Sequence, residues 1–301
     1  MKASLKWLNE WVDLSDYMAR PTGAQEIADI LTARGLEAEG VYRQDQGLEK
    51  VISVQIVEKK KHPEADRLSI CTVNTGAKNE DGTTAYLEIV CGAQNMKMGD
   101  VVCLAQIGAN LPNGMKIEKG KIRGVVSNGM LCSEVELGLK ESSDGLLILP
   151  EKTPVGWKIA DVLVLDDVII EIKLTANRGD CLSHRGLARE LSAALNRPLK
   201  QPKLPQLNYD TTTGGPKPFK VELHAGEDAP QFFGCFIEGV KVGPSPGWLK
   251  TRLEAIGQRS ISNIVDVSNF LMFEYGFPVH IYDADKLEGG VIQVQKAQKG
   301  Q

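Results

Sequence analysis

Short apolar runs separated by turn residues fill residues 51–150, and this spacing constrains the fold more than any other feature of the chain. Strands with turn signals every dozen or so residues predict a small closed antiparallel barrel. Asn113-Gly114 is a strong hairpin signal because both residues tolerate positive φ. A five-stranded barrel of this kind is an OB-fold, a common platform for oligonucleotides. The apolar runs are Val51–Val57, Ser69–Val73, Tyr86–Val90, Val101–Ile107 and Met115–Ile117.

Sequence blocks within this stretch resemble the tRNA-binding OB domain of aminoacyl-tRNA synthetases. Two of them, Cys91-Gly92-Ala93 and Met130–Leu139, are similar to the variant found in the β subunit of bacterial phenylalanine–tRNA ligases. Several blocks in the same order are more specific than one short motif. The resemblance implies an OB-fold that binds tRNA. The blocks are His62–Leu68, Ile89–Asn95, Gly108–Gly114 and Arg123–Ser133.

Basic side chains gather in two runs of the predicted barrel. The formal net charge of the 301-residue chain is -4, which argues against a general nucleic-acid coat but leaves room for a local basic face. The barrel has few aromatic residues, with Tyr86 the clearest, so phosphate contact is favoured over base readout. The alternative is that these side chains are solvated strand ends. The candidate tRNA-binding residues are Lys59, Lys60, Lys61, Arg67, Lys116, Lys119, Lys121 and Arg123.

Cysteine spacing and hydropathy argue against a metal site, a secreted protein and a membrane span. The six cysteines form no C-x-x-C pair and have no histidine partner at zinc spacing, so we expect reduced, mostly buried thiols and no metal site. No signal-peptide pattern follows Met1. No segment approaches the ~18 apolar residues that would suggest a membrane span. We therefore expect a cytoplasmic protein without a membrane partner.

Residues 1–40 predict two helices. Ser4 is a candidate cap for the first helix, and Pro21-Thr22-x-x-Gln25 is a candidate capping box for the second. Gly35 suits the position after the second helix. Two helices alone cannot bury their apolar faces, so they need a partner elsewhere in the chain.

That partner is expected after the barrel. Residues 162–172 read as two strand-like runs, and a helix capped by Ser183 follows. The polar cluster Thr175–Asp180 predicts a hydrogen-bonded turn at the start of this helix, with a functional loop as the alternative. We expect an α+β multidomain chain in which residues 1–40 and 151–198 form one small domain. The OB-fold domain, residues 41–150, is inserted in it, as the resemblance also implies.

A proline- and glycine-rich linker, residues 199–217, is expected to separate a further domain, residues 218–301. Phe219–Leu223, Phe232–Val240 and Val291–Val294 are strand-like. Ser245-Pro246 predicts the start of one helix, and a second is expected from Asn263 to Gly276.

This last segment resembles the start of the α/β domain with which the phenylalanine–tRNA ligase β subunit hydrolyses mischarged tyrosyl-tRNA. The resemblance implies that the editing domain is truncated here. It also implies a pocket lined by Ser268, Asn269 and His280, with serine where the family usually has threonine. The alternative is that Ser268 and Asn269 cap neighbours or face water, and that His280 closes a turn.

The resemblance implies a division of labour between subunits. No P-loop and no G-x-G-x-x-G motif is present, so we expect no cofactor on this chain and no aminoacylation by it alone. ATP and Mg²⁺ are expected to be used by the full ligase, whose synthetic centre lies in the α subunit. The implied partners are tRNA(Phe) and that α subunit, in an α2β2 heterotetramer.

Two other readings remain open at this point. A stand-alone OB-fold tRNA-binding or chaperone protein would have no hydrolytic role, although it would also have no need of residues 243–290. Alternatively, these domains mainly support subunit assembly.

Overall fold

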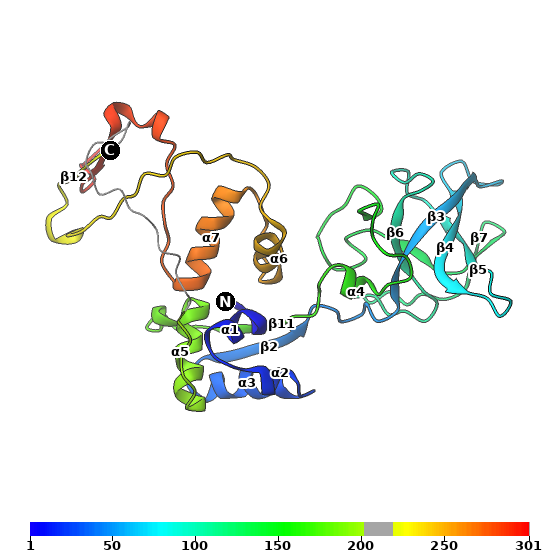
Figure 1. Ribbon diagram of the computed structural model, residues 1–301, viewed down its shortest axis with the longest axis horizontal. Coiled ribbons are helices and arrows are strands. Elements are labelled where there is room, and N and C mark those ends of the chain that lie inside the picture. Colours follow the sequence, from blue (N-terminus) through cyan, green and yellow to red (C-terminus); the bar gives the residue numbers. More distant parts are fainter. Residues whose placement is uncertain (202–218, 301) are drawn as a thin grey trace. The chain divides into compact units, whose positions relative to one another are not determined.

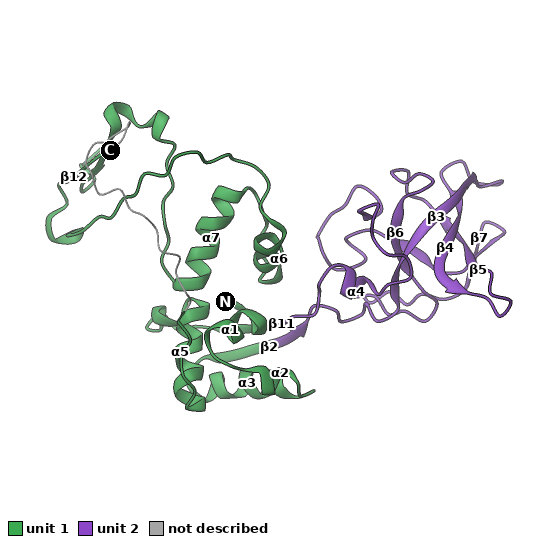
Figure 2. Cartoon of the chain, viewed as in Figure 1, with its two compact units in different colours: residues 1–40, 170–301 green, residues 41–169 purple. Residues whose placement is uncertain are grey.

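The computed structural model describes residues 1–201 and 219–300. These residues form two compact units, and each is described separately below. Unit 1 consists of residues 1–40 and 170–301, whereas unit 2 consists of residues 41–169 (Figure 2). Of the expected linker at 199–217, residues 202–217 lie outside the described part of the chain.

Unit 2 is built on an antiparallel sheet that curls on itself (Figure 1). Its strands follow the order β10-β6-β3-β4-β5, and β9 pairs with the same edge of β6 as β10. Most of the predicted strands are therefore confirmed. The bounds are β3 (Val51–Lys61), β4 (Ser69–Lys78), β5 (Thr84–Cys91), β6 (Val101–Ala105), β9 (Met130–Cys132) and β10 (Ile148–Leu149).

The sheet closes only in part, and it forms a curled half-barrel where a closed barrel was expected. No ladder joins the free edge of β5 to β9 within the described residues. Two hydrogen bonds bridge this edge instead: the Asn128 N–H donates to the Glu88 carbonyl at 3.0 Å, and the Val90 N–H donates to Ser127 Oγ at 3.0 Å.

Strand β6 shows why apolar side chains pack against both faces of this sheet. Its residues are all buried, and successive side chains point to opposite faces. Val101, Cys103 and Ala105 enter one apolar cluster, while Val102 and Leu104 enter the other. The second cluster fills the inside of the half-barrel. The first lies on the outer face, where the short helix α4 (Ile159–Val162) contributes Ile159 to it.

Two short turns shape the segment between β6 and β9. Gly114 has φ +83, and the surrounding loop is closed by an isolated bridge between Asn110 and Lys116. A second, unpredicted hairpin pairs β7 (Gly120–Ile122) with β8 (Val125–Ser127). Its two turn residues, Arg123 and Gly124, have φ +48 and +88, as a two-residue turn of type I′ requires.

Unit 1 contains most of a three-stranded sheet, in the order β1-β11-β2. The expectation that residues 1–40 hold only two helices is therefore wrong. Two strands flank three helices there, because both strands pair with β11, which lies more than a hundred residues further along. The elements are β1 (Lys2–Ser4), α1 (Leu5–Trp11), α2 (Ser15–Met18), α3 (Gly23–Ala33), β2 (Glu37–Arg43), β11 (Val168–Lys173), η1 (Gly179–Cys181) and α5 (His184–Leu195).

Helix caps in unit 1 test the local predictions. Ser4 and Ser183 are confirmed as N-caps, since each hydroxyl accepts an N–H from the first turn, at 3.0 Å in both cases. The capping box at Thr22 is wrong: Thr22 has helical φ and ψ, and its hydroxyl donates to Glu26 instead. The cap at Ser245 is also wrong, because that hydroxyl is bonded to Asp266.

The remainder of unit 1 holds two helices and a parallel strand pair. The second helix is confirmed from Asn263, with Ser262 as its cap and Gly276 in the left-handed conformation after it. Residues 232–240 form no strand, nor do residues 162–165 of unit 2, because neither run pairs with a neighbour. The elements are β12 (Lys220–Leu223), η2 (Gly226–Asp228), α6 (Gly247–Ala255), α7 (Asn263–Tyr275), η3 (Ala284–Lys286), η4 (Glu288–Gly290) and β13 (Val291–Val294).

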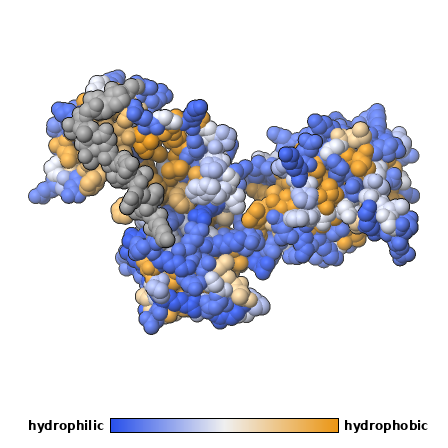
Figure 3. Space-filling view, viewed as in Figure 1, coloured by the Kyte–Doolittle hydropathy of each residue, from blue (hydrophilic) through white to orange (hydrophobic). Residues whose placement is uncertain are grey.

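Apolar side chains are visible on the surface of both units (Figure 3). Several of the most exposed belong to residues 233–282 of unit 1, including Phe233 at 89%, Ile237 at 72% and Phe277 at 69%. None of the helices in the described ranges, 1–201 and 219–300, is both long and apolar enough to cross a membrane.

Candidate functional sites

The two basic runs meet beside one turn of unit 2. The first run ends β3 and continues into the turn at residues 62–68, and the second leads into the β7–β8 hairpin. The His62 side chain bonds to the Ile122 carbonyl, and Glu64 approaches Gly124 at the hairpin turn. These segments are the connection between β3 and β4 and the hairpin between β6 and β9, and they lie side by side.

The candidate basic side chains differ in their partners. Lys59 Nζ donates to the Met96 carbonyl at 2.9 Å. Lys60 pairs with Glu58 at 2.8 Å, and Lys61 pairs with Asp66 at 2.7 Å. Both pairs are exposed, so each contributes only about 0–1 kcal/mol and a phosphate can displace the carboxylate. The exposed candidate cations with no ion pair among the described residues are Arg67, Lys116, Lys119, Lys121 and Arg123.

Tyr86 is 54% exposed on β5, as a stacking platform would require. Its ring makes no contact with another aromatic ring in the described chain. A single exposed ring offers stacking for one base at most, worth about 1–3 kcal/mol. The surface is therefore better suited to phosphate contact than to base readout.

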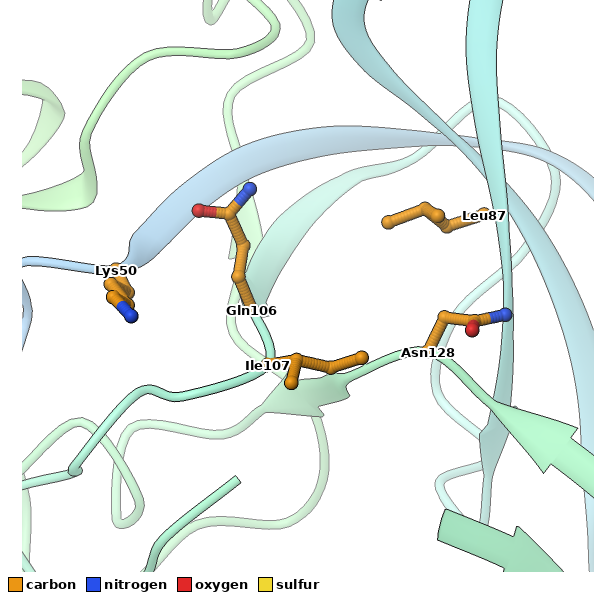
Figure 4. Close-up of a pocket in the computed structure, with 5 residues that line it drawn as sticks. All are labelled: Lys50, Leu87, Gln106, Ile107 and Asn128. Carbon is orange, nitrogen blue, oxygen red and sulfur yellow. The ribbon is translucent and has the colours of Figure 1, made fainter. Parts of the chain in front are cut away.

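Two shallow cavities lie near the start of β3 and the end of β6, beside β5. One, of about 370 Å³, is lined by apolar and amide side chains together with one lysine (Figure 4). The second, also about 370 Å³, shares Leu87 and Gln106 with the first and adds Ile52, Thr75 and Val155. The first is lined by Lys50, Leu87, Gln106, Ile107 and Asn128.

The three candidate editing residues lie on or just after α7. The Ser268 hydroxyl donates to the Val265 carbonyl at 2.7 Å, a bond within its own helix. His280 is exposed after the helix, and its ring lies 6.4 Å from that of Tyr282. No hydrogen bond joins any two of Ser268, Asn269 and His280 in the described part of the chain. The structure therefore gives each a position but does not assemble them into a bonded group.

Helix α7 itself is firmly anchored within unit 1, through residues that the sequence analysis did not single out. The Trp7 indole N–H donates to the buried Glu274 carboxylate. The Trp7 ring stacks between His184, at 3.9 Å between centroids, and Phe270, at 5.1 Å. Burial raises the pKa of Glu274, although the Trp7 hydrogen bond opposes this shift. The helix carrying the candidate editing residues thus packs against α1 and α5.

His184 completes this packing as a neutral, fully buried ring. Its Nε2 accepts the Ser4 N–H at 3.1 Å, so its Nδ1 carries the proton and donates to the Phe273 carbonyl at 2.9 Å. Burial lowers the pKa of His184 to about 3. A ring whose two nitrogens are both used in this way serves structure and is unsuited to general acid–base work.

The buried Asp266 carboxylate links the helices α6 and α7. Burial acts to raise its pKa, but hydrogen bonds from Ser245, Ser260 and the Ile261 N–H together lower it. These bonds join the start of α7 to the segments on both sides of α6. Asp266 therefore holds the connection between the two helices as a carboxylate.

One group of side chains in the described residues has the spacing of metal ligands, namely Asp180, Cys181 and Glu190. The Arg178 guanidinium bonds to all three, at 2.8 Å from Cys181 Sγ and 2.7 Å from Glu190. A cation already occupies the centre of the group, which argues against a metal there. The cluster instead forms the hydrogen-bonded turn expected ahead of α5.

Comparison with known proteins shows which families these parts of the chain resemble. Residues 51–158 match the family described as a putative tRNA binding domain, and residues 228–301 match the B3/4 domain. The β subunit of phenylalanine–tRNA ligase from Geobacter metallireducens is 45% identical over 301 residues. The same subunit from Geobacter sulfurreducens is 46% identical over 303 residues. The chain is similar along its whole length to phenylalanine–tRNA ligase β subunits.

The chain covers 36% of the length of each of these β subunits, and each match covers 100% of the chain. The resemblance stated from the sequence is thereby confirmed. Among solved structures, a MetRS related protein from Pyrococcus horikoshii covers 39% of the chain at 21% identity. That match spans 96% of the P. horikoshii protein, but its TM-score of 0.28 is too low to support an argument.

Proposed function

We propose that this chain acts as part of a phenylalanine–tRNA ligase β subunit, in which unit 2 contacts tRNA(Phe) and residues 218–301 contribute to editing. The observation that carries the proposal is similarity at 45–46% identity over the whole chain to β subunits of this ligase. The stand-alone binding protein is not favoured, because the similarity continues through the B3/4 domain at residues 228–301.

The proposed tRNA contact uses the two basic runs of unit 2. Five exposed cations there have no carboxylate partner in the described chain, and the turn and hairpin that carry most of them are bonded together. Such a surface supports contact with the sugar–phosphate backbone, which positions an RNA without reading its sequence. Affinity should therefore fall steeply as salt concentration rises.

The proposed editing step is the hydrolysis of tyrosine wrongly attached to tRNA(Phe). An apolar synthetic pocket rejects the added hydroxyl of tyrosine by only about 10²-fold, so a second, hydrolytic site is needed for further selectivity. We propose that Ser268 and Asn269 hold the ester or the terminal adenosine, and that His280 orients the substrate or the water. Substrate binding would have to release the Ser268 hydroxyl from the Val265 carbonyl.

Aminoacylation, with its ATP and Mg²⁺, is proposed to reside in the α subunit of an α2β2 heterotetramer. No phosphate-binding glycine loop was found in this sequence. The chain would then supply tRNA contact and part of the editing site, and it would not activate an amino acid alone.

A domain exchange tests the proposal. Residues 1–301 would replace the matching region of the G. metallireducens β subunit, co-expressed with its α subunit. We expect an assembled enzyme that charges tRNA(Phe) and hydrolyses tyrosyl-tRNA(Phe). An assembled, well-folded hybrid that binds no tRNA(Phe) would contradict the proposal.

A further inference from the structure

The side chain of His62 is buried in an otherwise exposed turn. It is 2% exposed, although Lys61 and Pro63 on either side are exposed. Its Nε2 lies 3.2 Å from the Ile122 carbonyl, and the Glu64 N–H points at its Nδ1 at 3.1 Å. Both ring nitrogens are therefore used, one within the turn and one toward the hairpin.

The hydrogen bonds define the protonation of the ring. A backbone N–H can only donate, so Nδ1 of His62 accepts and carries no proton. The ring proton must then be on Nε2, which donates it to the Ile122 carbonyl. The imidazole is neutral, and it acts as a donor that reaches across from one loop to another.

The turn end of the β7–β8 hairpin needs such a tether. The pair forms a two-stranded sheet of its own, and an isolated two-stranded hairpin is marginal in water. The Val90 N–H bond to Ser127 Oγ holds the far end of β8 but does not reach the turn. Ile122 immediately precedes the turn residues Arg123 and Gly124. Within residues 1–201 and 219–300, the His62 bond is the only hydrogen bond that ties residues 121–125 to another element.

We propose that His62 is a positioning residue for RNA, which fixes the hairpin that carries Lys121 and Arg123 beside the turn that carries Arg67. One phosphodiester backbone then meets both loops at once. This inference rests on the proposed tRNA contact of unit 2. It assigns to His62 an indirect role, because the ring is buried and donates to protein rather than to RNA.

A hairpin that is already held loses little conformational freedom on binding, whereas a free one must be ordered, which weakens affinity. Loss of one net hydrogen bond corresponds to about a three- to tenfold change in an equilibrium constant. We therefore expect tRNA binding to weaken about three- to tenfold when the His62–Ile122 bond is removed.

Two substitutions separate the two bonds of the ring. Asparagine places an oxygen near the position of Nδ1, so His62→Asn keeps the acceptor for the Glu64 N–H but cannot reach Ile122. Glutamine places an amide near the position of Nε2, so His62→Gln keeps the donor to Ile122. The first variant should release the hairpin and the second should retain it.

The test is binding of transcribed tRNA(Phe) to the 301-residue chain at several KCl concentrations. His62→Asn should weaken binding and reduce the salt slope, and His62→Gln should restore both. In the His62→Asn background, the double substitution Lys121→Ala and Arg123→Asn should have little further effect. The matched control, Arg67→Ala, should weaken binding equally in both backgrounds, because Arg67 belongs to the turn itself.

Hydrogen exchange of the free protein provides the second readout. Amides of residues 121–125 should exchange faster in His62→Asn only, while those of β3 and β6 stay protected. The inference is overturned if the β-sheet amides also lose protection, since His62 would then merely support the fold. It is equally overturned if the hairpin cations contribute the same affinity in both backgrounds. A wild-type chain that binds no tRNA at low salt would instead refute the proposed function on which the inference rests.

Discussion

Replacing Trp7 with phenylalanine should strongly destabilise unit 1. The side chain is 1% exposed, and its indole N–H donates to the buried Glu274 carboxylate. A hydrogen bond to a charged group contributes about 1.5–3 kcal/mol. The smaller ring also leaves a cavity, which adds about 1 kcal/mol for the missing volume. We expect the free energy of unfolding to fall by about 2.5–4 kcal/mol on these two counts.

Hydrogen exchange is the appropriate assay, because the chain has two units and a single unfolding midpoint would mix them. Amides of α1 and α7 should lose protection in Trp7→Phe, while those of β3 and β4 in unit 2 should not change. A double-mutant cycle with Glu274→Leu, which removes the acceptor, isolates the bond between the two side chains. A loss of less than about 0.5 kcal/mol, within the range of ordinary surface substitutions, would refute the reasoning.

Three further predictions concern pH, backbone strain and editing. Burial raises the pKa of Glu274 above its usual 4.5, so folding favours the neutral acid. Unit 1 should therefore lose stability as pH rises from 4.5 through the raised value, and Glu274→Gln should flatten this dependence in thermal unfolding. Gly129→Ala should destabilise unit 2 more than Gly114→Ala. A Cβ at Gly129 would lie 2.7 Å from the Ala105 carbonyl oxygen, whereas nothing lies within 4 Å of a Cβ at Gly114. Equal unfolding midpoints for the two variants would contradict this. In the proposed heterotetramer, His280→Ala should slow hydrolysis of tyrosyl-tRNA(Phe) while leaving charging intact, and wild-type hydrolysis would reject His280 as an editing residue.

The sequence predicted features that depend on near neighbours. The strands of unit 2 follow alternating apolar residues and turn signals, and the Ser4, Ser183 and Gly276 helix ends follow local hydrogen bonding. Predictions were weaker where secondary structure depends on pairing with a segment that is distant in the sequence. Residues 37–43 form a strand because β11 supplies an edge, and residues 232–240 form none because no strand lies beside them.

The same distinction applies to the candidate sites. Basic runs are visible in the sequence because charge is a property of each residue. The His62–Ile122 bond was not predictable, since it joins a side chain to a backbone carbonyl 60 residues away. The Trp7–Glu274 bond spans 267 residues and could not be inferred from spacing either. Ser268, Asn269 and His280 came from the resemblance alone and remain proposals.

The most direct test of the central claim is the salt dependence of tRNA(Phe) binding by the wild-type chain and by one variant. The variant combines Lys116→Ala, Lys119→Ala, Lys121→Ala and Arg123→Asn, and the asparagine suits the left-handed turn position. We expect the logarithm of the binding constant to fall linearly with the logarithm of salt concentration. The variant's slope should be smaller by about 3, because each phosphate that a cation neutralises accounts for ~0.7–0.9 of the slope. An unchanged slope, or wild-type binding that does not depend on salt, would contradict the account.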